Sequence, residues 1–162
     1  MPSLKKTNAA RVLDRMGIPY RLNSYPVDPD DLSAVHVAET LGVDPAVVFK
    51  TLVIRGEPNG IAFAVIPAAA VLDLKKTAAV FHDKRAEMVA FKELLPLTGY
   101  VRGGCSPIGA KKDYPVCVDE TALLFDEIYL SAGQRGLQFV LAPQDLARAV
   151  NAVFADITMA QA

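Results

Sequence analysis

The sequence has few cysteines, no long apolar run and no excess of charge of one sign, and each shortage excludes a class of protein. Two cysteines, Cys105 and Cys117, are too few for a disulfide scaffold or a zinc knuckle. The longest apolar stretch, residues 61–72, is shorter than the roughly 20 residues that span a bilayer, and Pro67 interrupts it. Seventeen basic and eighteen acidic residues give a net charge of −1, which argues against a polybasic DNA-binding protein.

No repeat, low-complexity tract or Gly/Ser-rich linker divides the 162 residues, so we expect one domain over residues 1–162. Apolar residues make up 52% and charged residues 22%, which is ordinary usage for a globular protein. The N-terminal residues 1–17 lack the apolar core of a signal peptide. Together these features predict a soluble, cytoplasmic protein without a membrane span.

Proline and glycine separate a series of short elements in the sequence. Apolar spacing and capping residues predict helices over residues 4–16, 33–41, 74–81, 91–95, 120–125 and 144–150. A short strand is expected over residues 20–25. Two β-hairpins are expected, one joining 49–55 to 61–66 and the other joining 127–132 to 137–142. Since hairpins require antiparallel pairing, the fold class is predicted to be α+β with a mixed, mainly antiparallel sheet and flanking helices.

The segment 102–112, Arg-Gly-Gly-Cys-Ser-Pro-Ile-Gly-Ala-Lys-Lys, is the first candidate for chemistry. It fails as a phosphate-binding P-loop because Ala110 follows Gly109, where that loop needs lysine and then serine or threonine. It fails as a serine-hydrolase elbow because position 108 is isoleucine rather than glycine. Two readings remain: a tight surface turn, or a rigid loop whose backbone N–H groups face an anion or oxyanion.

Lys50 is the second candidate, because strand alternation places it on the apolar face of Leu52 and Ile54. Such a lysine either extends its ammonium to solvent at the strand end or lines a pocket that holds a carboxylate, a phosphate or a polarised carbonyl.

Cys105 could be a nucleophile only with a base, and neither His36 nor His82 stands in a recognisable thiol-protease context. The simpler interpretation is that Cys105 is a packed cysteine without a chemical role. The histidines and cysteines also lack metal-ligand spacing, so we expect no metal site.

Four motifs in one order carry a resemblance that covers nearly the whole chain. They are Val-Phe-Lys-Thr-Leu at 48–52, Ala-Val-Leu-Asp-Leu-Lys-Lys at 70–76, Thr-Gly-Tyr-Val-Arg-Gly-Gly-Cys-Ser-Pro-Ile-Gly at 98–109, and Ile-Tyr-Leu-Ser-Ala-Gly-Gln-Arg-Gly-Leu at 128–137. The sequence resembles the YbaK/EbsC family of free-standing tRNA-editing deacylases, kin to the editing domain inserted in bacterial prolyl-tRNA synthetases. The resemblance implies a partly barrel-like sheet.

The activity that the resemblance implies is removal of cysteine from mischarged Cys-tRNA(Pro), and less selectively from Cys-tRNA(Cys). Editing is needed because a hydrophobic pocket separates ligands of similar size by only about 1–3 kcal/mol. In this family the substrate thiol is thought to attack its own ester carbonyl, so no cofactor is implied. Prolyl-tRNA synthetase is the implied partner. The alternatives are a deacylase for alanyl-, seryl- or threonyl-tRNA, and a non-catalytic module that binds tRNA or a synthetase.

Site residues follow from the resemblance position by position. Lys50 matches the family's pocket lysine, and Ser131 matches a serine beside the reacting carbonyl. The Gly-x-x-x-Pro loop, whose backbone donors would stabilise the oxyanion, corresponds to Gly103, Gly104, Cys105, Ser106 and Pro107. Tyr25 matches a pocket tyrosine and Thr51 a neighbour of the lysine.

Three positions depart from the family pattern. Cys105 stands where relatives usually carry an aliphatic residue, and Gln138 stands where they often carry aspartate. The loop 26–33 is shorter and lacks an expected aromatic residue. The last two departures bear on amino-acid specificity more than on the reaction.

Overall fold

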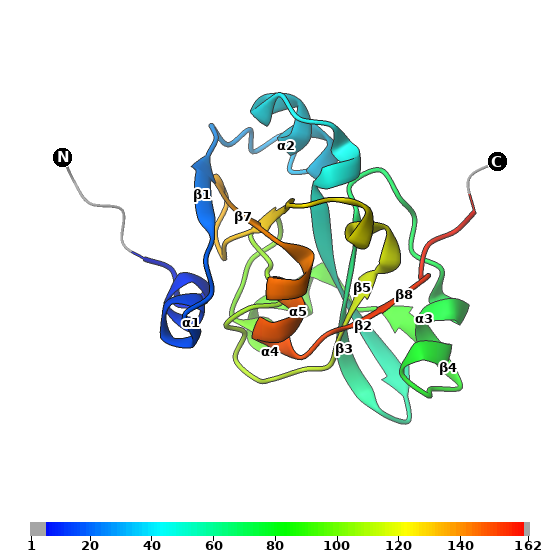
Figure 1. Cartoon of the computed structure of the whole chain (residues 1–162). Coiled ribbons are helices and arrows are strands. Elements are labelled where there is room, and N and C mark those ends of the chain that lie inside the picture. Colours follow the sequence, from blue (N-terminus) through cyan, green and yellow to red (C-terminus); the bar gives the residue numbers. More distant parts are fainter. Residues whose placement is uncertain (1–5, 161–162) are drawn as a thin grey trace.

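The computed structural model describes residues 6–160 and contains two β-sheets (Figure 1). In the smaller sheet, β7 (Leu137–Leu141) lies between β1 (Arg21–Ser24) and β6 (Ile128–Ser131), and both pairings are antiparallel. The larger sheet has the strand order β4-β2-β3-β5-β8. Its strands are β2 (Phe49–Glu57), β3 (Gly60–Pro67), β4 (Arg85–Met88), β5 (Val116–Asp119) and β8 (Val153–Ala155).

Both predicted hairpins are confirmed, as β2–β3 and β6–β7. The sheet is mixed because β5 pairs in parallel with both β3 and β8. A parallel bridge between Val48 and Tyr129 links the start of β2 to β6 and brings the two sheets together. The α+β class with mainly antiparallel pairing is therefore confirmed.

Helices surround the sheets, and the caps predicted at Gly17, Gly42 and Asp73 are present. The helices are α1 (Asn8–Met16), α2 (Ala34–Leu41), α3 (Leu74–Val80), α4 (Leu94–Thr98) and α5 (Pro143–Val150), with 3-10 turns η1 (Pro45–Val47), η2 (Phe91–Glu93) and η3 (Glu120–Leu124). The Ser33 hydroxyl accepts a hydrogen bond from the His36 amide, and the Asp73 carboxylate caps α3 in the same way. Gly17 ends α1 with φ of 67°, a conformation that favours glycine.

The structure differs from the expectation at a few places. The predicted helix 91–95 is divided between η2 and the first residues of α4. Strands β4, β5 and β8 were not predicted. Leu4, expected on the first helical face, lies outside the described residues.

The main core fills the space between the two sheets. Phe63 of β3, Phe139 of β7 and Ile128 of β6 are fully buried there. In residues 6–160 no helix is long and apolar enough to cross a membrane. The position of α2 matters for the site: it lies at the end of the molecule where β2 begins (Figure 1).

Candidate functional site

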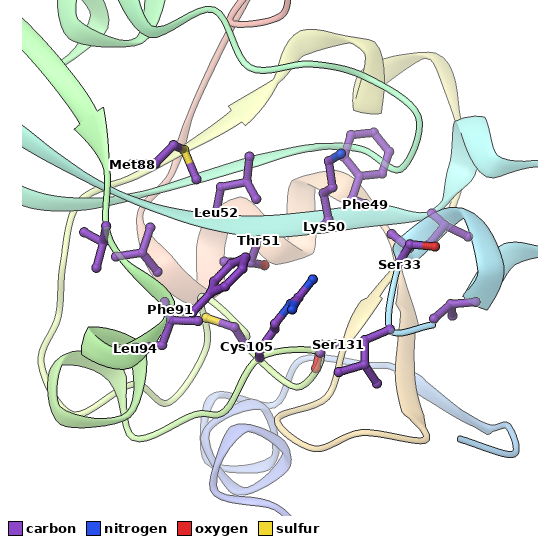
Figure 2. A pocket seen from close by; sticks show the side chains of 18 of the residues that line it. Ser33, Phe49, Lys50, Thr51, Leu52, Met88, Phe91, Leu94, Cys105 and Ser131 are labelled. Atoms are coloured by element: carbon purple, nitrogen blue, oxygen red, sulfur yellow. The ribbon is translucent and has the colours of Figure 1, made fainter. Parts of the chain in front are cut away.

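A cavity of about 250 Å³ opens at the end of the molecule where β2 begins. Its walls come from β2, the start of α2, the segment from β4 to α4, the loop 102–105 and the paired strands β6 and β7 (Figure 2). Most of the lining side chains are apolar. The polar and charged ones are Ser33, Lys50, Thr51, Arg102, Ser131 and Gln138. A small, mostly apolar cavity with a few polar groups is typical of a small-molecule site.

The loop that forms one wall is held against the β6–β7 turn. The Arg135 side chain donates a hydrogen bond from Nε to the Arg102 carbonyl at 2.8 Å. Gly104 donates its amide to the Val101 carbonyl at 2.9 Å, which closes a tight turn. In residues 6–160 no backbone carbonyl accepts a hydrogen bond from the Gly103 or Cys105 amide. Of the predicted oxyanion donors, the Gly103 and Cys105 amides therefore combine a missing backbone acceptor with a place in the cavity lining, whereas the Gly104 amide is used within the loop.

Lys50 lies half-buried on the cavity wall. It shares its side of β2 with Leu52, as predicted, while Thr51 projects from the other side toward Phe91 and Cys105 (Figure 2). Burial lowers the pKa of Lys50 below its ordinary value. No carboxylate among the described residues lies close enough to raise the Lys50 pKa again. The Lys50 ammonium therefore has no anionic partner within residues 6–160.

The mouth of the cavity carries a second cation. The Arg102 guanidinium lies 4.2 Å from the centroid of the Phe91 ring, the geometry of a cation–π contact. Phe91 is 63% exposed, which is unusual for an aromatic side chain of this size. The mouth therefore presents an aromatic face beside a positive charge.

The lining contains neither a carboxylate nor an imidazole. Cys105 is the only thiol in it, and burial raises the pKa of that thiol to about 12, so it is protonated at neutral pH. The Ser131 hydroxyl accepts a hydrogen bond from the Gly133 amide at 3.2 Å, and Ser33 caps α2. The described residues also contain no group of side chains suited to a metal ion. The site thus lacks the carboxylate or imidazole that most often serves as general base for activating water.

Two buried side-chain oxygens in the cavity wall have no hydrogen-bond partner. They are Thr51 Oγ1 and Gln138 Oε1, and no other buried side-chain nitrogen or oxygen in residues 6–160 shares this property. Buried polar atoms are nearly always paired because leaving one unpaired costs about 1–3 kcal/mol. These two atoms are therefore candidates for contacts with a bound molecule.

The structure brings together Lys50, Thr51, Gly103, Cys105 and Ser131 around the cavity. Four other residues suggested by the resemblance do not line it. Gly104 and Ser106 are buried behind the loop surface, where the Ser106 hydroxyl accepts from the Ile108 amide. Pro107 faces a separate depression on the surface, beside α1 and α5. Tyr25 follows β1 and donates its amide to the Gly136 carbonyl.

Phe91 was not among the predicted site residues, Arg102 was noted only as the start of the segment 102–112, and Gln138 only as a departure that bears on specificity. The sequence does indicate the position of Gln138. A four-residue turn between residues 132 and 137 places Ser131 directly opposite Gln138 in the hairpin. That register puts both side chains on one face of the sheet. Phe91 and Arg102 lie outside the strands, and no periodic pattern indicates where their side chains point.

Comparison with known proteins agrees with the motif order. The family described as the aminoacyl-tRNA editing domain matches residues 28–149. EbsC of Enterococcus faecalis, named for a proposed Cys-tRNA(Pro)/Cys-tRNA(Cys) deacylase activity, is 45% identical over 154 residues, which cover 95% of this chain and 94% of EbsC.

Solved structures share the fold. One, described as a proposed trans-editing enzyme for prolyl tRNA synthetase, has a TM-score of 0.83 and 25% identity, covering 98% of this chain and all of that one. The hypothetical protein APE2540 has a TM-score of 0.86 and 23% identity, over 94% of this chain and 100% of its own. The matched family, which spans most of the chain, together with EbsC shows that this protein belongs to the aminoacyl-tRNA editing domain family.

Proposed function

We propose that this protein is an aminoacyl-tRNA deacylase that removes cysteine from mischarged tRNA(Pro), and from Cys-tRNA(Cys) with less selectivity. Membership of the editing-domain family and the similarity to EbsC support the reaction class. The observation that carries the choice of cysteine is the absence of any carboxylate or imidazole from the cavity lining. Water depends on such a base, whereas a thiol ionises near neutral pH, so a substrate that brings its own thiol depends on it far less.

The proposed reaction begins with attack of the substrate's thiol sulfur on its own ester carbonyl carbon. A carbon–sulfur bond forms, the bond from that carbon to the terminal ribose oxygen breaks, and the thiol proton passes to the ribose oxygen. The products are tRNA with a free terminal hydroxyl and a cysteine thiolactone, which water later opens to free cysteine. No residue of the protein is acylated, in keeping with the protonated state of the buried Cys105 thiol.

The chain's part in this reaction is to hold the ester and to stabilise negative charge on its carbonyl oxygen. The available amides of Gly103 and Cys105 are the proposed oxyanion donors. Lys50 supplies a positive charge from β2, held in the cavity wall without a carboxylate of its own. Ser131 and Thr51 are proposed as polar contacts of the aminoacyl group. The size of the cavity suits an aminoacyl group, since pockets for drug-sized ligands usually exceed about 300 Å³.

Association with prolyl-tRNA synthetase is the second part of the proposal. Phosphate contacts dominate tRNA affinity, and a net charge of −1 supplies few of them. Binding to a synthetase that already holds the tRNA would raise the effective concentration of substrate at the cavity.

The test is deacylation of tRNA(Pro) charged in parallel with cysteine, alanine, S-methylcysteine and proline. We expect release of cysteine only, and a loss of about 100-fold or more in the Lys50→Ala variant, by analogy with the loss of an oxyanion-stabilising group. Lys75→Ala, an exposed lysine on α3, is the matched control and should leave the rate unchanged.

Each other result points to a different function. Release of alanine or S-methylcysteine would show that water, rather than the substrate thiol, is the nucleophile. Absence of any deacylation, with the synthetase present, would favour a non-catalytic tRNA-binding module.

A further inference from the structure

Gln138 has an uncommon environment for an amide side chain. It lies in β7 directly opposite Ser131 of β6, is only 5% exposed, and lines the cavity. Its Oε1 atom is buried without a hydrogen-bond donor. Because an unpaired buried acceptor is costly, a bound aminoacyl group that brings a hydrogen-bond donor to this position would be stabilised there.

The orientation of the substrate limits the choice of donor. The ribose stays attached to the tRNA and therefore stays at the mouth, where Phe91 is exposed. The aminoacyl group enters the cavity and meets the buried wall. The α-amino group is the strong N–H donor that every such group carries, whereas a thiol is a weak donor.

The charges of the cavity lining also favour Gln138 Oε1 as the acceptor. Two cations, Lys50 and Arg102, line the cavity, and no carboxylate is available there to receive an amino group. A neutral carbonyl oxygen is then the group that can accept its hydrogen bond. Thr51 Oγ1, the other unpaired atom, lies on β2 in the other sheet, so it approaches the substrate from a different wall.

We infer that Gln138 recognises the free α-amino group of the substrate through Oε1 and so makes the site selective for aminoacyl-tRNA over N-acylated tRNA such as peptidyl-tRNA. N-acylation removes one N–H and adds bulk in a cavity of about 250 Å³. Gln138 is a specificity-determining residue in this assignment, and the carbonyl chemistry belongs to other groups. The inference rests on the proposed function for the identity of the ligand.

The experiment measures binding of two stable analogues of the tRNA end, so that it does not depend on turnover. One is 3′-amino-3′-deoxyadenosine joined by an amide bond to cysteine, and the other carries 3-mercaptopropionate, which keeps the thiol and lacks the amino group. We expect the wild type to bind the cysteine analogue about 10- to 100-fold more tightly, the usual contribution of one hydrogen bond to a charged group. In Gln138→Leu the two affinities should agree within about threefold.

Two further variants guard against a structural artefact. Gln138→Glu keeps a carbonyl acceptor and should retain the preference for the cysteine analogue. Gln144→Leu makes the same change on the exposed surface of α5, outside the cavity lining, and should leave both affinities at their wild-type values.

The outcomes separate this inference from the proposed function. An unchanged preference in Gln138→Leu, equal binding of both analogues by the wild type, or binding of neither would overturn the assignment. A preference that depends on Gln138 without any deacylation of Cys-tRNA(Pro) would support the assignment and reject the deacylase.

Discussion

A Cβ atom added at Gly104 would lie 3.1 Å from the backbone nitrogen of Arg135. The α-carbon of Gln134 would be equally close, so the loop 102–105 and the β6–β7 turn are packed backbone against backbone. Flexible side chains can move aside, but backbone atoms of a paired hairpin cannot do so easily. Gly104 does not have a positive φ, so its backbone conformation does not require glycine. The close approach of the two backbones is what requires a residue without a side chain at this position.

Gly104→Ala should displace the loop and with it the amides of Gly103 and Cys105. We expect kcat/KM for Cys-tRNA(Pro) to fall by at least about 10-fold, with about 1–3 kcal/mol lost from the free energy of unfolding, as is usual for overpacking. Gly42→Ala is the control, because it has φ of 71° and no neighbour within 4 Å of an added Cβ. It should lower stability without lowering activity. Equal activities of the two variants would contradict the role of the loop.

Cys105→Ala should keep deacylation within about threefold of the wild type. Burial raises the pKa of the Cys105 thiol to about 12, so the thiolate is scarce at neutral pH and the thiol acts as a packing group. We expect about 1 kcal/mol of lost stability from the removed sulfur. Urea unfolding and single-turnover deacylation measure both effects. Complete loss of activity in a folded Cys105→Ala protein would instead indicate a protein nucleophile.

Lys50→Met should change how stability depends on pH. Burial lowers the pKa of Lys50 in the folded protein, so between that pKa and the ordinary value of 10.5 the unfolded chain binds more protons than the folded one. Stability of the wild type therefore gains from Lys50 as the pH rises through this window, and the charged lysine is a cost below it. Lys50→Met should be the more stable protein at pH 7, and its advantage should vanish near pH 10.5. Thermal unfolding at several pH values tests the sign.

Phe91→Ala should raise KM for charged tRNA with little change in kcat. The ring is 63% exposed at the cavity mouth beside the Arg102 guanidinium, and stacking of a base on such a face contributes about 1–3 kcal/mol. Because the side chain is exposed, its removal should change stability by no more than about 0.5 kcal/mol. Leu124→Ala, at 78% exposure and away from the cavity lining, is the control. Equal KM values for the two variants would argue against a contact with the terminal base.

The fold could be predicted where local chemistry determines the structure. Glycine-rich turns between β-branched runs identify both hairpins, and Ser33 and Asp73 mark helix starts because their side chains cap free amides. Strand β4 was missed because it has only four residues, two of them charged, and pairs only with β2. Strand β5 is only four residues long, and its parallel pairing with β3 depends on contacts distant in sequence.

The site was predictable to the extent that motifs carry it. Lys50, Gly103 and Cys105 were identified from their sequence neighbourhood, and all three line the cavity. The hydrogen bond that occupies the Gly104 amide, and the unpaired oxygen of Gln138, depend on which groups meet in three dimensions. Such pairing has no signature in a single sequence.

Thr51→Val should make the protein more stable and less active. Threonine and valine have nearly the same shape, so the substitution removes the hydroxyl whose Oγ1 is buried without a partner and leaves the packing on β2 intact. We expect the free energy of unfolding to rise by up to about 1 kcal/mol and kcat/KM for Cys-tRNA(Pro) to fall by about 5- to 10-fold, the contribution of one hydrogen bond.

Thr121→Val is a suitable comparison, since the Thr121 hydroxyl donates to Asp119 at 2.6 Å and its loss should only lower the stability of the protein. The Thr51 hydroxyl lowers the stability of the folded protein, and a contact with substrate would explain why it is present. If Thr51→Val instead lost stability at full activity, the hydroxyl would have a structural role, and the cavity wall at Thr51 would not contact the aminoacyl group.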